Sequence, residues 1–188
     1  ILGIGQDTMS DGGKAGLTFE MKGAYDEQVV PSSGAWGYNG SALQKYLEED
    51  FYGRLGARMR DEKSGIVGVT KRHQVNNTMT LQTAVYQHVF VPSFYEIFGV
   101  TRTSGGWNNA ESASNSFQYQ HFAKGGANVS ASPYRVKKDS TGAARIWVGR
   151  SAQYDGNLRT HISGAYMDGS MSRVSSGSPS WFAPCFCL

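Results

Sequence analysis

Two cysteines and four histidines have the widest chemical capability in this chain, and neither set is arranged for catalysis. Cys185 and Cys187 stand two residues apart in an apolar segment, where we expect buried, inert thiols. A disulfide between them would be badly strained. The histidines, at positions 73, 88, 121 and 161, are scattered, and no serine stands in a Gly-x-Ser-x-Gly turn. The sequence therefore predicts that the protein is not an enzyme.

Side chains suited to contacting another molecule gather from Arg145 to Leu188. Apolar residues that we expect to point inward alternate there with Tyr, Ser, Asn, Asp, Arg and Trp. This mixture of rigid amphipathic side chains and small hydrogen-bonding ones is typical of binding loops. The expected inward residues are Ile146, Val148, Ile162, Met167, Met171, Val174, Phe182 and Phe186. The expected ligand-binding residues are Tyr154, Asp155, Asn157, Arg159, His161, Tyr166, Asp168, Arg173, Ser176, Ser178 and Trp181.

The composition argues against several classes of partner. The net charge is only +3 and the basic residues are scattered, whereas a nucleic-acid-binding protein clusters them on one face. No apolar run approaches the roughly 18 residues of a membrane span, so we expect neither nucleic acid nor membrane insertion. Asp7, Asp11 and Asp26 are not spaced as a calcium-binding EF-hand loop. We expect no metal and no cofactor.

Two segments carry the start signals of helices. Ser41 with Gln44, and Ser93 with Glu96, have the spacing of a capping box. In that motif the first side chain accepts a backbone N–H of the first turn, and the other reaches back. We expect the first helix to direct the three carboxylates of residues 48–50 into solvent, and the second to end at a glycine.

Short strand-like segments surround these helices. The candidates are residues 17–21, 28–30, 65–70, 85–91, 129–136, 143–148, 158–162 and 182–188. Residues 72–83 favour a polar loop or an irregular hairpin. Together with 24 glycines, these elements predict a loop-rich α+β fold in one domain. Residues 1–35 would be an N-terminal strand and loop segment of the domain formed by residues 36–188, and we expect a further segment before Ile1.

Four motifs resemble a known family. They are Trp36–Leu47, Val89–Gly99, Ile146–Ser151 and Ala183–Leu188. In order and spacing they resemble an uncharacterised domain family found at the C-terminal ends of phage tail and bacterial surface proteins. That family is similar to the C-type-lectin-like fold, in the branch shared with formylglycine-generating enzymes and with variable proteins of diversity-generating retroelements. The resemblance covers residues 36–188.

The resemblance implies a C-type-lectin-like fold with two helices around short antiparallel strands. Residues 145–182 would form a displayed ligand-binding region, either diversified by a retroelement or fixed. The partner would be a bacterial surface protein or glycan. The protein would be a phage tail or adhesin-like protein, in the virion or at the cell surface, as a homotrimer or attached to a larger tail protein.

Two alternatives to ligand recognition stay open. One is a structural virion or oligomerisation domain without its own ligand. The other, implied by the oxidases of the same fold branch, is a cysteine-dependent oxidase-like enzyme that uses Cys185 or Cys187. Residues 107–109 resemble a lectin calcium motif, but they carry a neutral Asn in place of the acid. We therefore expect no required calcium.

Overall fold

The computed structural model of the chain describes residues 1–31, 38–60, 67–75, 81–101, 111, 116–154 and 160–188. For residues 71–75, 81–84, 154 and 160 it describes the backbone alone. Within these residues the fold is mixed α+β, with mostly strands and few helices. The predicted class is confirmed at this level.

The first sheet joins the early part of the chain to its last residues. Its strands, in order across the sheet, are β1 (Gly3–Ile4), β2 (Leu17–Glu20), β12 (Cys185–Cys187) and β5 (Val89–Phe90). All neighbours are antiparallel, and Phe186 of β12 pairs with both Phe19 and Val89. The two cysteine side chains are fully buried, which confirms the burial predicted for them.

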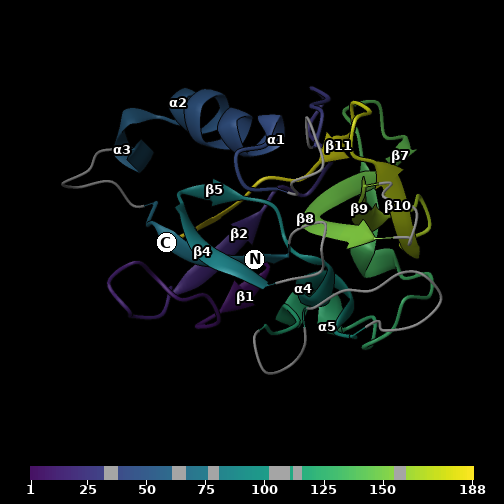
Figure 1. Cartoon of the computed structure of the whole chain (residues 1–188), viewed down its shortest axis with the longest axis horizontal. Helices are drawn as coiled ribbons and strands as arrows, with labels where there is room; N and C mark the ends of the chain where they lie inside the picture. Colours follow the sequence, from purple (N-terminus) through teal and green to yellow (C-terminus); the bar gives the residue numbers. More distant parts are fainter. Residues whose placement is uncertain (32–37, 61–66, 76–80, 102–110, 112–115, 155–159) are drawn as a thin grey trace.

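The second sheet is built from the last third of the chain. Its strands, in spatial order, are β10 (Met171–Ser175), β9 (Thr160–Ala165), β8 (Trp147–Tyr154) and β11 (Trp181–Phe182). β11 runs parallel to β8, with Trp181 beside Trp147, whereas the other neighbours are antiparallel. Two separate hairpins are β3 (Thr70–Val75) with β4 (Leu81–Gln87), and β6 (Lys137–Lys138) with β7 (Ala144–Arg145). Figure 1 shows the first sheet in its left half and the second in its right half.

Short helices pack around these sheets. Three of them follow one another without a break: α1 (Ala42–Lys45), the π-helical segment η1 (Tyr46–Phe51) and α2 (Tyr52–Arg54). The other described helices are α3 (Ala57–Arg60), α4 (Phe94–Phe98), α5 (Gln120–Ala123) and the 3-10 turn η2 (Pro133–Arg135). Ser93 and Glu96 form the predicted capping box at the start of α4. Gly99 ends α4 with a φ of 67°, a left-handed conformation that suits glycine.

The cap of α1 differs from the predicted one in a single hydrogen bond. The Ser41 hydroxyl accepts the Gln44 N–H at 3.1 Å, as predicted. The Gln44 side chain, however, accepts from the N–H of Gly40 at 2.5 Å, because the Ser41 N–H already donates to the Tyr38 carbonyl. The helix start is therefore stabilised by two side-chain contacts, one residue displaced from a standard box.

Glu49 and Asp50 are exposed as predicted, but the Glu48 side chain is only 26% exposed and turns towards the protein. Its Oε1 accepts the backbone N–H groups of His88 and Val89, and its Oε2 lies 3.1 Å from the His88 ring. The Tyr52 ring stacks on the same histidine, with centroids 4.3 Å apart. Glu48 therefore ties η1 to the edge of β5.

Two buried clusters connect the sheets to the helices. One packs α4 and α5 against both sheets and contains Phe94, Phe122, Trp147 and Cys185. The other packs α1 and η1 against Val89, Val148, Ile162 and Phe182, with Leu43 and Leu47 as the helical residues. Each cluster draws on both sheets, so the described elements form one continuous core.

Two other expectations about the elements are wrong. Residues 129–136 contain the η2 turn in place of a strand, because Pro133 cannot donate a ladder hydrogen bond. Of the strand expected at residues 65–70, residues 65 and 66 lie outside the described residues, Gly68 forms a single β-bridge with Cys187, and β3 begins at Thr70. Ile146 and Met167, expected inside, are 36% and 55% exposed. Met167 follows β9 in a turn, where strand alternation no longer directs its side chain.

Candidate functional site

A buried ion-pair network fixes β8, an interior strand of the second sheet, against α4. Arg150 donates to both carboxylate oxygens of Glu96, at 2.7 and 2.5 Å. Glu111 accepts the Tyr95 N–H and the Ser151 hydroxyl. Burial raises the pKa of Glu111, and the positive charge of Arg150 opposes that rise. This network holds the sheet that carries the predicted ligand-binding residues.

Predicted residues of β9 and β10 share one face of that sheet. Gln153, His161 and Ser175 lie in one row across three strands, and Ser163 lies opposite Arg173 in the next row. Because alternate residues of a strand point to the same face, all five side chains share it. Arg173 is exposed and His161 is half-buried. Within the described residues, Gln153 Oε1 and Ser163 Oγ are buried without a hydrogen-bond partner, so the face has unused polar capacity.

Tyr166 and Asp168 lie at the opposite end of the sheet, in the turn between β9 and β10. Tyr166 is 43% exposed. Asp168 accepts the hydroxyl of Ser170 at 2.6 Å and its N–H at 2.9 Å, and these bonds lower the pKa of Asp168. β9 has 6 residues and therefore spans about 20 Å. A small ligand cannot contact both Tyr166 and the end of β8 at Tyr154.

Trp181 lies in a shallow groove of about 290 Å³ beside the second sheet. The groove is lined by Gln28, Arg145, Ile146, Val174, Pro179, Ser180 and Trp181. The Arg145 guanidinium lies over the Trp181 ring, 5.0 Å from its centroid. Arg145 is held there by Asp139, to which its Nε donates at 2.6 Å. The structure therefore presents an indole ring and a guanidinium in one fixed arrangement.

The remaining predicted residues divide into two groups. Ser178 is exposed, whereas Ser176 is only 9% exposed. It follows β10 directly, in the connection that leads on to β11. Asp155, Asn157 and Arg159 lie outside the described residues, and Tyr154 is placed by its backbone alone.

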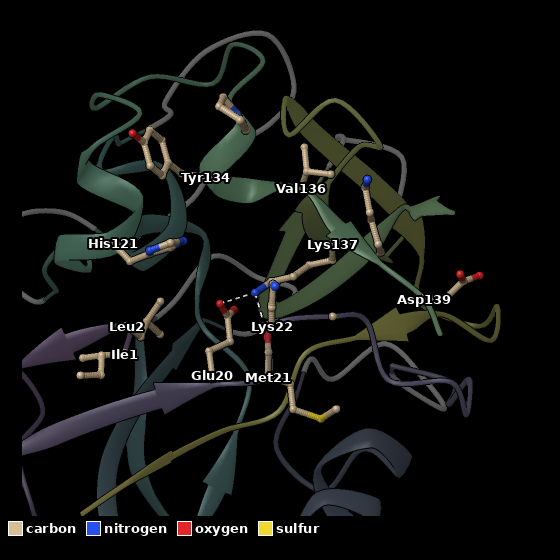
Figure 2. Close-up of a pocket in the computed structure, with 13 residues that line it drawn as sticks. Ile1, Leu2, Glu20, Met21, Lys22, His121, Tyr134, Val136, Lys137 and Asp139 are labelled. Carbon is tan, nitrogen blue, oxygen red and sulfur yellow. Dashed lines mark hydrogen bonds and ion pairs between the residues drawn. The ribbon is translucent and has the colours of Figure 1, made fainter. Parts of the chain in front are cut away.

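A second cavity contains none of the predicted residues. It has a volume of about 840 Å³ and is lined by residues of β2, α5, η2 and β6, among them Glu20, His121, Tyr134 and Lys137. Figure 2 shows the Glu20 carboxylate and the Lys137 ammonium facing each other in this pocket. Four distant segments form its walls, so no local pattern could indicate it.

The relationship of the chain to known proteins rests on one match. Residues 18–188 match the family described as Domain of unknown function (DUF6273). The chain belongs to the DUF6273 family. No curated protein and no solved structure shows a significant match to it.

No group of three or more His, Cys, Asp or Glu side chains among the described residues could hold a metal ion. None of the described helices has the length and apolar character that a bilayer crossing needs. The features on which a function can be argued are the face of the second sheet, the Trp181 groove and the Glu20 pocket.

Proposed function

We propose that this DUF6273 domain is a ligand-binding module that recognises a protein or glycan on a bacterial surface. The observation that carries the proposal is the Trp181 groove, where Asp139 holds the Arg145 guanidinium over the indole ring. Trp and Arg are the residues most enriched among those that dominate binding energy at interfaces. Because the two side chains are already fixed, a partner would lose little entropy in ordering them.

Exposed and half-buried side chains of β9 and β10 supply the rest of the proposed binding surface. Arg173 and His161 would set its polarity from one side. The two ends of β9 are about 20 Å apart, so a protein or an extended glycan could use both ends, whereas a single sugar could use only one. This spacing favours a large partner over a small one.

We further propose that the fold is C-type-lectin-like and that the protein acts as part of a phage tail or an adhesin, in the virion or at a cell surface. Three features support the fold proposal: β12 pairs with β2, helices α1 and α4 pack in buried clusters that include residues of the first sheet, and β8–β11 form a separate sheet. In this proposal residues 145–182 are the displayed region, either diversified by a retroelement or fixed. It involves no catalysis, and the full burial of Cys185 and Cys187 argues against the oxidase-like alternative.

The proposal is tested by binding of the fluorescently labelled full chain to intact Gram-negative and Gram-positive cells, measured by flow cytometry. We expect Trp181→Ala to weaken saturable binding by about 30-fold, since truncation of such a side chain costs about 2 kcal/mol. Tyr86→Ala is the matched control, because Tyr86 is an exposed aromatic on the separate hairpin of β3 and β4. Equal binding by both variants, at unchanged melting temperature, would contradict the site; no saturable binding of the wild type would contradict the function.

A second function, self-association as a structural domain, is favoured by one observation. Tyr166 and Met167 are adjacent, and they are 43% and 55% exposed. Two neighbouring exposed apolar side chains suit a subunit contact. Light scattering would show a trimer or dimer that Met167→Ser dissociates. A monomer at every concentration would exclude this alternative.

A further inference from the structure

The pocket of about 840 Å³ and the Trp181 groove have no lining residue in common, and they are connected by the ion pair between Asp139 of the pocket and Arg145 of the groove. Its volume falls in the range of small-molecule sites, about 300 to 1,000 Å³. Apolar walls come from Leu2, Pro133 and Val136. Figure 2 shows Leu2, His121 and Tyr134 on one side of Glu20 and Lys137.

A buried ion pair forms the polar centre of the pocket. Lys137 donates to Glu20 Oε2 and to the Met21 carbonyl at 3.0 Å, and the side chains of Glu20 and Lys137 are each 5% exposed. Lys137 Nζ also lies 5.6 Å from the centroid of the Trp147 ring. The lysine is therefore fully engaged by groups of the protein.

The other carboxylate oxygen of Glu20 has no hydrogen-bond partner among the described residues. Burial raises the pKa of Glu20, and Lys137 opposes that rise. A buried acceptor without a donor costs free energy, and the Glu20 side chain lines the pocket. A ligand that brings an O–H or N–H group to this oxygen would remove that cost.

The mouth of the pocket carries positive charge. Lys22 and Lys138 line it, and both are exposed with no ion pair in the described structure. The acidic group nearest in sequence to Lys138, Asp139, is already paired with Arg145. An anionic group on a ligand would therefore meet two ammonium groups, while the charge of the Asp139 carboxylate, which also lines the pocket, is neutralised by Arg145.

One wall offers a flat, uncharged surface. The rings of His121 and Tyr134 meet edge to face, with centroids 5.8 Å apart. Burial lowers the pKa of His121, and the positive charges of Lys137 and Lys124 lower it further. The imidazole is therefore neutral near pH 7 and adds no charge to this wall.

We propose that this pocket binds a small hydroxylated carboxylic acid of the size of a sugar acid. One hydroxyl donates to the unpartnered oxygen of Glu20, the carboxylate lies between Lys22 and Lys138, and the C–H face packs against Tyr134. The site is independent of the proposed surface-recognition function. It requires no catalytic step.

The test is isothermal titration calorimetry of the full chain with D-glucuronate, D-galacturonate and D-gluconate, and with D-glucose and D-galactose as neutral matches. We expect at least one acid to bind with a Kd of about 1 mM or tighter, and its neutral match at least about tenfold more weakly, because charge-assisted hydrogen bonds are lost. No binding by any of the three acids at a concentration about tenfold above that Kd would overturn the proposal.

Variants distinguish this pocket from other sites. The double variant Lys22→Ala, Lys138→Ala changes only exposed side chains, so we expect it to fold. Its affinity for the acid should fall about tenfold, while its affinity for the neutral sugar should not change. Lys45→Ala on α1 is the matched control and should bind normally. Glu20→Gln should weaken the binding of the acid and of its neutral match by the same factor. Unchanged affinity in the double lysine variant would overturn the proposal, whereas unchanged affinity in Trp181→Ala is expected, because that residue belongs to the other site.

Discussion

Replacing Arg150 with methionine should destabilise the protein strongly, because it leaves two buried carboxylates without their nearby cation. Arg150 donates to both oxygens of Glu96 and to the Val91 carbonyl at 2.8 Å, and its charge acts on Glu111. Side chains of Arg150 and Glu96 are 2% and 4% exposed. Removing one partner of a buried ion pair costs about 3 to 5 kcal/mol. For a chain of this length that corresponds to a fall in melting temperature of about 6 to 20 °C.

The pH dependence of this loss identifies its cause. Without Arg150, the pKa of Glu111, already raised by burial, rises further. Between the raised pKa and the ordinary one, Glu111 is protonated in the folded variant but ionised in the unfolded chain. The stability of the variant therefore increases as the pH falls through the raised pKa. We expect the gap between variant and wild type to narrow from about pH 7 to about pH 5.

The assay is urea unfolding followed by tryptophan fluorescence at both pH values, with calorimetry for the melting temperature. Arg173→Met is the matched control, since Arg173 is exposed on β10 and the same substitution there should change stability by less than about 0.5 kcal/mol. A loss of less than about 1 kcal/mol for Arg150→Met, or the same loss at both pH values, would refute the reasoning.

Three smaller predictions concern a turn, a helix end and the thiols. Asp139, whose hydrogen bonds lower its pKa to about 2 from 3.8, stabilises the fold above that ordinary value, so Asp139→Asn should lower the melting temperature at pH 7. The gap should close as the pH falls towards about 2; a gap that persists in acid would contradict this. Gly99→Ala should cost about 1 to 3 kcal/mol in urea unfolding, because its φ is 67°. Gly53→Ala, in open space within α2, should stabilise by up to about 1 kcal/mol, and equal effects at the two glycines would be inconsistent with the backbone argument. Cys185 and Cys187 should react with a thiol reagent at least about 100-fold more slowly in the native than in the unfolded protein, and rapid native labelling would show that they are accessible.

The elements that the sequence predicted best are those with local signals. The Ser93–Glu96 box and the glycine after α4 lie within seven residues, and the structure contains both. The burial of the thiols followed from an apolar segment in the same way. These local preferences do not depend on tertiary contacts, and in natural sequences they agree with the final fold.

The surface could not be predicted as well, because burial there depends on segments distant in sequence. Glu48 lies in a run of acidic residues that we expect to face solvent, yet it accepts the N–H groups of His88 and Val89 at the start of β5. Ser176 has the composition of a binding loop, yet it is buried. The proposed ligand residues fall at two ends of β9, a separation that only the register of the sheet sets. The Glu20 pocket required four segments to meet.

The place of β12 in the first sheet has a consequence for how the domain is made. In Figure 1 the end of the chain runs between β2 and β5. Among the described strands, β2 and β5 are joined through residues 185–187, which the ribosome adds after them. At about 5 to 20 residues per second, residue 187 follows β5 by about 5 to 20 s. During that interval the edges of β2 and β5 that β12 will cover are open, so a chaperone can bind them. A ribosome stalled before residue 187 should therefore hold a chain whose first sheet is still divided.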